Sequence, residues 1–169
     1  LHPRYVMFIQ NSVVLAGVAA VITVTAAMLL GTYHRLTRSK VAFASLFIGR
    51  LGYAVPGGVI AVGLLVPFAQ FDNWLDAQME AVFGISTGLL ISGSIWLMII
   101  AYMIRFLAAA IGAYESGLAT VTTNIDAAAR VLGRSAWGTV RDVHISMLRP
   151  SLLTAALIVF VDTIKELPA

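Results

Sequence analysis

The sequence predicts an all-α fold, a polytopic bundle of about four transmembrane helices with a long cytoplasmic connection. Three observations lead to this prediction. The chain of 169 residues is 60% hydrophobic and only 11% charged, whereas soluble domains are about 45–50% apolar and about 25% charged. Long apolar stretches recur along the chain. Lys and Arg are concentrated in two of the segments between these stretches.

Four apolar stretches give the expected spans. Three of them carry no charged side chain and cover residues 13–33, 51–71 and 84–104. A helix rises about 1.5 Å per residue, so ~20 apolar residues cross a hydrocarbon core of ~30 Å. The fourth stretch, residues 148–164, reaches a spanning length only with its flanks and includes Asp162. We therefore expect residues 1–169 to form part of one transmembrane domain.

The distribution of charge gives an orientation. The segment between the first two spans and the segment after the third hold nine of the eleven basic residues, and these are Arg35, Arg38, Lys40, Arg50, Arg105, Arg130, Arg134, Arg141 and Arg149. Cytoplasmic connections carry an excess of Lys and Arg, so we expect both segments in the cytoplasm. The second connection, residues 72–83, has three acids and no base. It is expected outside, as a solvated loop.

Two of the spans carry small residues at every fourth position. Small residues at this spacing let helices approach closely inside a membrane, where no hydrophobic effect drives their association. We therefore expect both faces to pack against neighbouring helices. The positions are Ala19, Thr23, Ala27 and Gly31 in the first span, and Gly84, Gly88 and Ser92 in the third.

The second span contains helix-breaking residues. Pro56 removes a helical hydrogen bond and Gly57 adds flexibility. Broken helices in membranes are tolerated inside protein or against a water-filled cavity, and transporters use them to line their paths. Two interpretations stay open here, a simple proline kink and a segment of a path for solute that includes Tyr53.

The long connection of residues 105–147 predicts two short helices. Asn124 is a suitable N-cap for a first helix that Gly133 would end. Ser135 can cap a second, amphipathic helix that includes Trp137 and Val143. Together they would form a projection at the cytoplasmic surface that a partner protein could bind.

This connection resembles the conserved cytoplasmic loop of binding-protein-dependent ABC importer permeases, in which Glu-Ala-Ala precedes a glycine. Aligned on Gly133, the alanines are Ala128 and Ala129, while Ala127 stands at the position of the Glu and Asp126 precedes it. The family's Ile-x-Leu-Pro motif falls on residues 143–146, where a serine replaces the proline. Residues 51–57, 88–94, 101–106 and 160–168 resemble the ferric-iron subfamily.

The resemblance implies the type I importer permease fold, with this chain as the C-terminal part of a longer permease of the bacterial inner membrane. It implies three partners: a cytoplasmic ATPase that binds ATP and Mg²⁺, a periplasmic solute-binding protein, and a second permease half or copy. No Gly-x-x-x-x-Gly-Lys-Ser/Thr occurs, so we expect no enzyme activity and no cofactor in this chain. The coupling residues would be Asp126, Ala127, Ala128, Ala129, Gly133, Trp137 and Val143.

The last span ends in a cluster of charged residues. Asp162, Lys165 and Glu166 share one helix face, and ionisable groups inside a span usually face an interior path. The alternative is a cluster that reaches interfacial water by snorkelling. If the first interpretation holds, the path for solute is lined by Tyr53, Pro56, Gly57, Asp162, Lys165 and Glu166.

Two other functions compete with the permease: a secondary ion-coupled carrier that uses Asp162, Lys165 and Glu166, and a structural membrane subunit. The projection between residues 125 and 145 favours the permease, because a carrier does not need it. The basic residues form no contiguous polar surface, so nucleic acid is not an expected partner. No catalytic dyad is found, and the three histidines lie too far apart in sequence to suggest a metal site.

Overall fold

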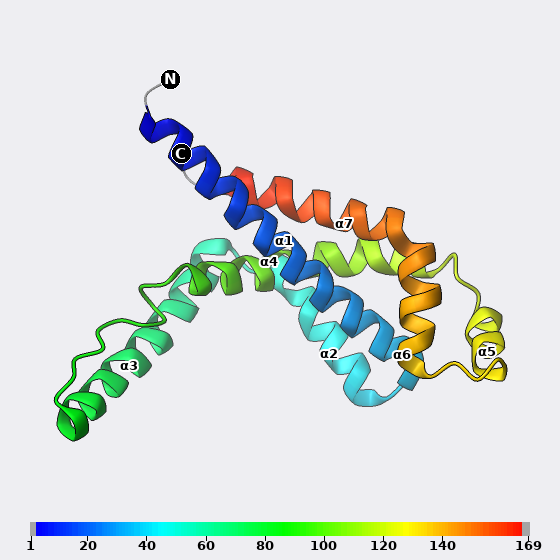
Figure 1. The fold of residues 1–169 in the computed structure, drawn as a ribbon, viewed down its shortest axis with the longest axis horizontal. Coiled ribbons are helices and arrows are strands. Elements are labelled where there is room, and N and C mark those ends of the chain that lie inside the picture. Colours follow the sequence, from blue (N-terminus) through cyan, green and yellow to red (C-terminus); the bar gives the residue numbers. More distant parts are fainter. Residues whose placement is uncertain (1–2, 167–169) are drawn as a thin grey trace.

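The computed structural model describes residues 3–166, and this part of the chain is helical without any β-strand (Figure 1). The all-α prediction is confirmed. The elements are α1 (Pro3–Thr37), α2 (Lys40–Leu51), the 3₁₀ turn η1 (Gly52–Ala54), α3 (Gly57–Phe83), α4 (Ile95–Leu118), α5 (Thr123–Val131), α6 (Ala136–Thr139), the π-helical turn η2 (Val140–His144) and α7 (Ile145–Glu166).

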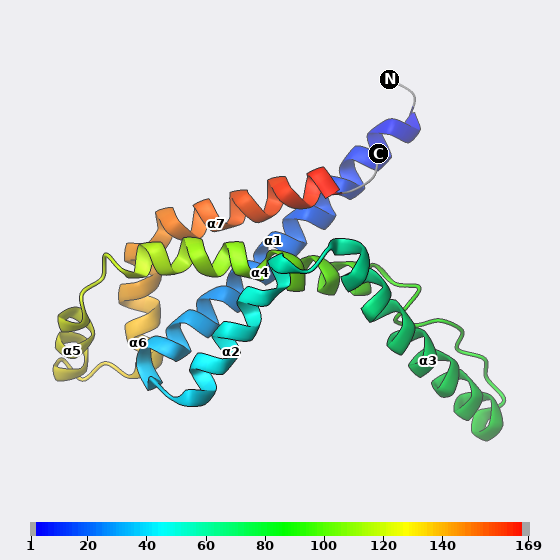
Figure 2. The same ribbon diagram turned by 180° about the vertical axis from the view of Figure 1, so that it is seen from behind.

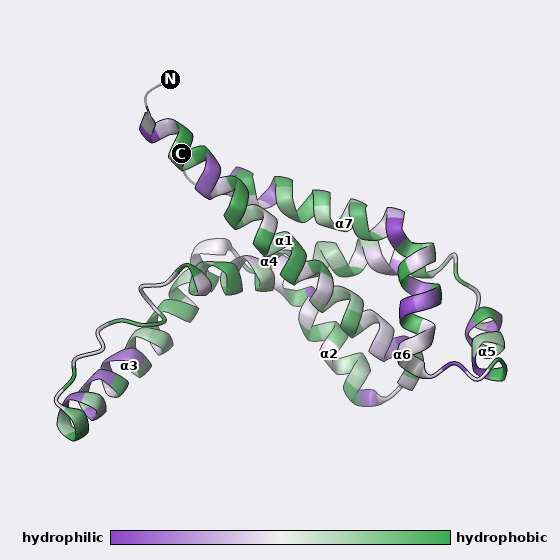
Figure 3. Cartoon of the chain, viewed as in Figure 1, coloured by the Kyte–Doolittle hydropathy of each residue, from purple (hydrophilic) through white to green (hydrophobic). Residues whose placement is uncertain are grey.

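Four helical segments are long and apolar enough to cross a membrane, as predicted. They are Arg4–Thr37, Gly57–Phe83, Ile95–Leu118 and Trp137–Glu166, the last formed by α6, η2 and α7 together. Large apolar side chains are exposed along them, for example Val21, Val62 and Leu157 at 61–66%. Figure 3 shows hydrophobic residues dominating α1, α2, α4 and α7. Lipid is the environment that this surface fits.

Helices α1, α4 and α7 pack together and form the core of the molecule (Figure 2). The small face predicted on α1 lies in this core, where Ala19, Thr23 and Ala27 are fully buried. A Cβ atom built on Gly31 would lie 2.7 Å from the ring of Tyr114 on α4. The close approach of helices predicted from the fourfold spacing is therefore confirmed for α1.

Helix α3 leaves this core, and the chain returns beside it without helical structure (Figure 1). The predicted span over residues 84–104 is wrong in its first half, because α4 begins only at Ile95. Gly84 ends α3 in the left-handed conformation (φ 66°), and Gly88 also has a positive φ of 61°. The second small face therefore does not exist as a helix face.

Two carboxylates explain why residues 84–94 run beside α3. The backbone amides of Ile91 and Ser92 donate to Asp72, at 3.0 Å and 2.7 Å, and the amides of Thr87 and Gly88 donate to Asp76, at 2.6 Å and 2.9 Å. The expected solvated loop over residues 72–83 is wrong, since these residues are the last three turns of α3 and Asp72 is only 1% exposed.

The break predicted in the second span is present, but it lies at the start of that span. α2 ends at Leu51, η1 follows, and Pro56 is the N-cap of α3, which begins at Gly57. A Cβ atom on Gly52 would lie 1.8 Å from the carbonyl oxygen of Ile104. Only glycine therefore allows η1 to pack this closely on α4.

The long connection is shorter than the predicted range of residues 105–147. α4 continues to Leu118, so Arg105 lies inside a helix and does not belong to the loop. On the other side, α6 and η2 continue directly into α7 and turn a sharp corner near the start of α7 (Figure 1). Pro150 lies inside α7 close to this corner, and proline is a common cause of such bends.

Candidate functional site

The loop between α4 and α7 contains the two short helices that the sequence predicts. Helix α5 ends in a Schellman motif, in which Gly133 donates to Arg130 (2.9 Å) and Arg134 donates to Ala129 (3.0 Å). Gly133 has a φ of 76°, the left-handed conformation that this motif requires of the residue after the C-cap. The amide of Gly138 donates to the side chain of Ser135 (3.1 Å), which confirms the predicted cap of the second helix.

α5 begins two residues earlier than predicted. The N-cap is Thr122, not Asn124, and its side chain makes no capping hydrogen bond. Asn124 instead lies within α5 on its exposed side. The N-terminus of α5 is fixed by contacts with the rest of the molecule.

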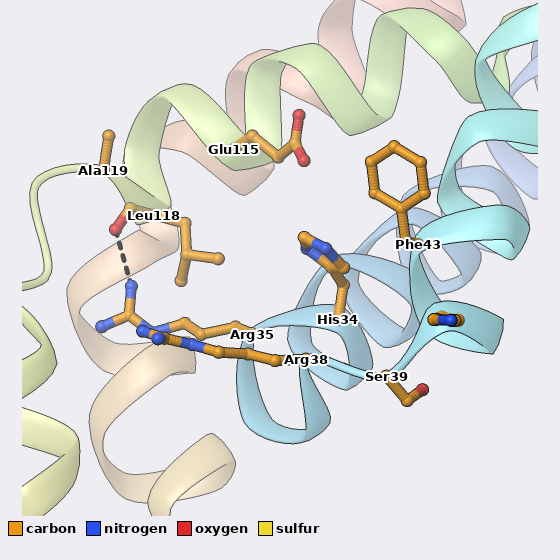
Figure 4. A pocket seen from close by; sticks show the side chains of 9 residues that line it. His34, Arg35, Arg38, Ser39, Phe43, Glu115, Leu118 and Ala119 are labelled. Atoms are coloured by element: carbon orange, nitrogen blue, oxygen red, sulfur yellow. Dashed lines mark hydrogen bonds between the residues drawn. The ribbon is translucent and has the colours of Figure 1, made fainter.

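These contacts centre on Asp126, which is 6% exposed. Arg35 at the end of α1 donates from Nε to Asp126 (2.6 Å), and His144 of η2 donates from Nε2 to the other carboxylate oxygen (2.8 Å). Arg35 also donates to the carbonyls of Leu118 (2.9 Å, drawn in Figure 4) and Val121 (2.6 Å). This Asp126 cluster of Asp126, Arg35 and His144 joins α1, the end of α4, α5 and η2.

The electrostatics of the cluster favour a charged Asp126. Burial alone would raise the pKa of this carboxyl, but the hydrogen bonds from His144 and Arg35 and the positive charge of Arg35 together hold its pKa below the usual range. Asp126 is therefore an ionised acceptor at neutral pH, and its partners satisfy both of its oxygens.

The opposite face of α5 is exposed and mostly apolar. Ala127, Ala128 and Val131 lie on this face, with Leu132 directly after the helix, and Val131 and Leu132 are 88% and 81% exposed. Trp137 of α6 is also 63% exposed, but it lines a separate cavity beside the C-terminal part of α1. We call the residues Ala127, Ala128, Val131 and Leu132 the α5 apolar face.

The predicted coupling residues therefore divide into two groups. Ala127, Ala128 and Trp137 are exposed, and Gly133 is the exposed end of α5. The others are not on the exposed surface: Asp126 and Ala129 are buried, and Val143 is half-buried in η2. Val131 and Leu132 are additions to the prediction, and their period of three to four residues with Ala128 could have identified them.

A second site lies inside the transmembrane part, around Arg105 in the middle of α4. Its guanidinium donates from Nε to Glu166 at the end of α7 (2.7 Å) and from Nη1 to the carbonyl of Val55 before α3 (3.0 Å). A Cβ atom on Gly57 would lie 3.2 Å from the guanidinium carbon, so Gly57 leaves room for the Arg105 side chain. Arg105 thus joins the middle of α4 to the break before α3 and to the end of α7.

Beside this ion pair lies a cavity of about 650 Å³. Its walls come from the first turns of α3, the end of the segment 84–94, α4 and α7. Most of the wall is apolar, and the polar groups on it include Ser92, Ser94, Tyr102, Arg105 and Glu166. An ion pair inside a span that faces such a cavity is typical of a functional position in a membrane protein.

The residues predicted for the solute path do not all meet. Gly57 and Glu166 line the cavity, while Tyr53, Pro56, Asp162 and Lys165 do not. Asp162 pairs with Lys165 at 3.7 Å instead, and Lys165 is 70% exposed. Arg105 was missed as a path residue because the apolar run ends directly before it, which suggested a cytoplasmic position. The apolar residues that follow Arg105 were the signal that α4 continues.

Four helical segments long and apolar enough to cross a membrane, with a short amphipathic helix in the loop between the last two, define a polytopic membrane protein. Comparison with known families matches residues 22–169 to the binding-protein-dependent transport system inner membrane component. The chain therefore belongs to this family of ABC importer permeases.

A curated relative agrees with this assignment. The chain is 27% identical over 163 residues to an Fe(3+)-transport system permease protein of Haemophilus influenzae, an alignment that covers 95% of this chain and 28% of the relative. The chain thus spans little more than a quarter of the length of the relative that it matches. No solved structure matches the chain.

Proposed function

We propose that this chain is part of the permease subunit of an ATP-driven importer in the bacterial inner membrane, and that its solute is ferric iron delivered by a periplasmic binding protein. Membership of the permease family supports the transport role. The name of the Haemophilus influenzae relative supports iron as the solute. A second permease half or copy would complete the path.

The observation that carries the proposal is the α5 apolar face. Val131 and Leu132 are large apolar side chains exposed at the end of a short helix outside the spans, and exposed apolar patches of this kind mark protein interaction sites. A cytoplasmic ATPase that binds ATP and Mg²⁺ would accept this face in a cleft. Ala127 and Ala128 would allow the close approach of the two surfaces.

The cavity beside Arg105 is the proposed segment of the solute path in this chain. Glu166 supplies carboxylate oxygens, the ligand type suited to a hard cation, and Arg105 balances its charge while the path is empty. Solute transfer would therefore require Glu166 to separate from Arg105, and this step can be linked to movement of α4 against α7.

The coupling role is tested by Ala128→Glu in the full-length permease, reconstituted with its ATPase and its iron-loaded binding protein. A charge buried without a partner in the contact costs about 3 kcal/mol, so ATPase association should weaken about a hundredfold and ATP-dependent iron accumulation should be lost. Ala128→Ser is the matched control, since it keeps the small size without a charge, and it should behave as wild type.

Unchanged association and uptake in Ala128→Glu would refute the coupling role. A wild-type permease that couples ATP hydrolysis to a different solute would refute iron alone. The two parts of the proposal can therefore fail separately.

A further inference from the structure

A basic cavity of about 870 Å³ lies at the other end of the bundle, between the end of α1, the start of α2 and the end of α4. Figure 4 shows His34 and Arg38 on the α1 side, Ser39 and Phe43 on the α2 side, and Glu115 on α4. Lys40 completes the wall. Neither the α5 apolar face nor the Arg105 cavity includes these residues.

The charges in this cavity do not cancel. Arg35, which also lines it, is paired with Asp126, and the carboxylate of Glu115 is paired with Arg50. The side chains of Arg38 and Lys40 make no hydrogen bond or ion pair within the described part of the chain, and both residues are exposed. Two unpaired cations therefore remain at one hollow.

The backbone holds one of these cations in an unusual conformation. Arg38 has a φ of 49°, and it is the only residue besides glycine with a positive φ among residues 3–166. Glycine or asparagine would suit this position better if only the turn between α1 and α2 mattered. The turn brings the side chains of Arg38 and Lys40 to the same cavity, and Ser39 between them caps α2 through the amide of Ala42 (3.1 Å).

The surroundings of the cavity are those of a membrane surface. The apolar stretch of residues 13–33 ends directly before His34. Tyr33, Val41 and Phe47 are exposed apolar residues beside the basic ones, at 45–67%. A ligand with an anionic head and apolar chains would satisfy both parts of this surface, whereas free phosphate would satisfy only the first.

From this arrangement we infer that the cavity binds the phosphate group of an anionic phospholipid from the leaflet that the charge pattern assigns to the cytoplasm. Arg38 and Lys40 donate to the phosphate oxygens, and the acyl chains lie along the exposed apolar residues of α1 and α2. The inference does not depend on which solute the permease carries.

The test places the full-length permease in nanodiscs of phosphatidylcholine mixed with phosphatidylglycerol and then releases it into detergent. Native mass spectrometry counts the phosphatidylglycerol molecules that stay bound to the released permease. Each basic side chain near an anionic lipid contributes a factor of about five, so Arg38→Gln with Lys40→Gln should weaken retention about 25-fold. Arg149→Gln removes an exposed charge from the same predicted side but outside the cavity, and it should retain phosphatidylglycerol as wild type does.

If the double variant does not fold, Arg38→Gly tests the same site, because glycine accepts the positive φ and removes the charge. Retention equal to that of wild type in the double variant, or in Arg38→Gly where the double variant does not fold, would overturn the inference. A second arm adds inorganic phosphate to the permease in detergent. Thermal stabilisation by phosphate that requires Arg38 and Lys40, without retention of phosphatidylglycerol, would also overturn the lipid assignment.

Discussion

At the scale of single residues, Asp126 shows how far the sequence of the loop could be interpreted. Its place in the loop was predicted, but its role was not, because the partners of its carboxylate lie on other elements. The decisive partners, Arg35 and His144, are 91 and 18 residues away in sequence. A cluster assembled over such separations leaves no local pattern.

The Asp126 cluster predicts a large effect of Asp126→Ala. The substitution leaves Arg35 and His144 without their acceptor, and breaking a buried ion pair costs about 3 kcal/mol. Asp142→Ala is the matched control, because its pair with Arg134 is exposed and contributes at most about 1 kcal/mol. Thermal unfolding of the full-length protein in detergent, followed by fluorescence of the tryptophans, measures both.

The pH dependence of this effect has a fixed sign. Because the pKa of Asp126 is lower in the folded protein than in the unfolded chain, its contribution is present above the unfolded pKa and is lost as pH falls through the folded pKa. The difference between wild type and Asp126→Ala should therefore be constant near neutral pH and shrink only below about pH 4. A difference that shrinks already near pH 6 would contradict the assignment to Asp126.

At the scale of elements, hydropathy and spacing predicted that the spans exist but misplaced their boundaries. The segment 84–94 carries no charged side chain, as expected of a transmembrane helix, and its small residues recur every fourth position. It is not a helix, because Asp72 and Asp76 accept the amide protons of Thr87, Gly88, Ile91 and Ser92. Here a carboxylate on one element accepts hydrogen bonds from the backbone of another. Such a tertiary contact cannot be predicted from the helix propensity of a single segment.

The contact between Arg105 of α4 and Glu166 of α7 leads to a prediction at this scale. Arg105→Gln and Glu166→Gln each remove hydrogen bonds to a charged group, which contribute about 1.5–3 kcal/mol, so each should lower the proposed solute uptake about tenfold or more. The double variant has no unpaired charge and should recover part of that loss. Uptake into proteoliposomes at limiting solute measures the cycle.

Asp162→Asn is the control, since its partner Lys165 is 70% exposed and such pairs contribute little. Strictly additive losses in the double variant would show that Arg105 and Glu166 act independently. The pathway assignment would then have to be withdrawn.

At the scale of the whole molecule, the fold class and the four spans follow from composition and the length of the apolar runs. The predicted orientation does not change with the shifted boundaries. Although Arg105 leaves the loop, the bases that remain between α4 and α7 still exceed those of the acidic end of α3. The departure of α3 from the core could not be predicted, because its 27 residues are apolar enough to suggest burial in the bundle.

The predicted orientation can be checked with single cysteines, since the chain contains none. Cysteines at Thr37 and Ser135 should react with a membrane-impermeant maleimide only after the cells are opened, and a cysteine at Asn73 should react in intact cells. All three positions are exposed in the structure, so access is limited by the membrane alone. Labelling of position 135 in intact cells would reverse the topology and exclude contact between α5 and a cytoplasmic ATPase.

The bonds of Arg35 have a mechanical consequence. The linker before α5, residues 119–122, could act as a spring that absorbs any displacement of α5. Arg35 prevents this, because it is bonded to the carbonyls of Val121 and Thr122 as well as to Asp126. We infer that α5 behaves as the end of a stiff strut, so that a load on its exposed side reaches the ends of α1 and α4 with little loss in between.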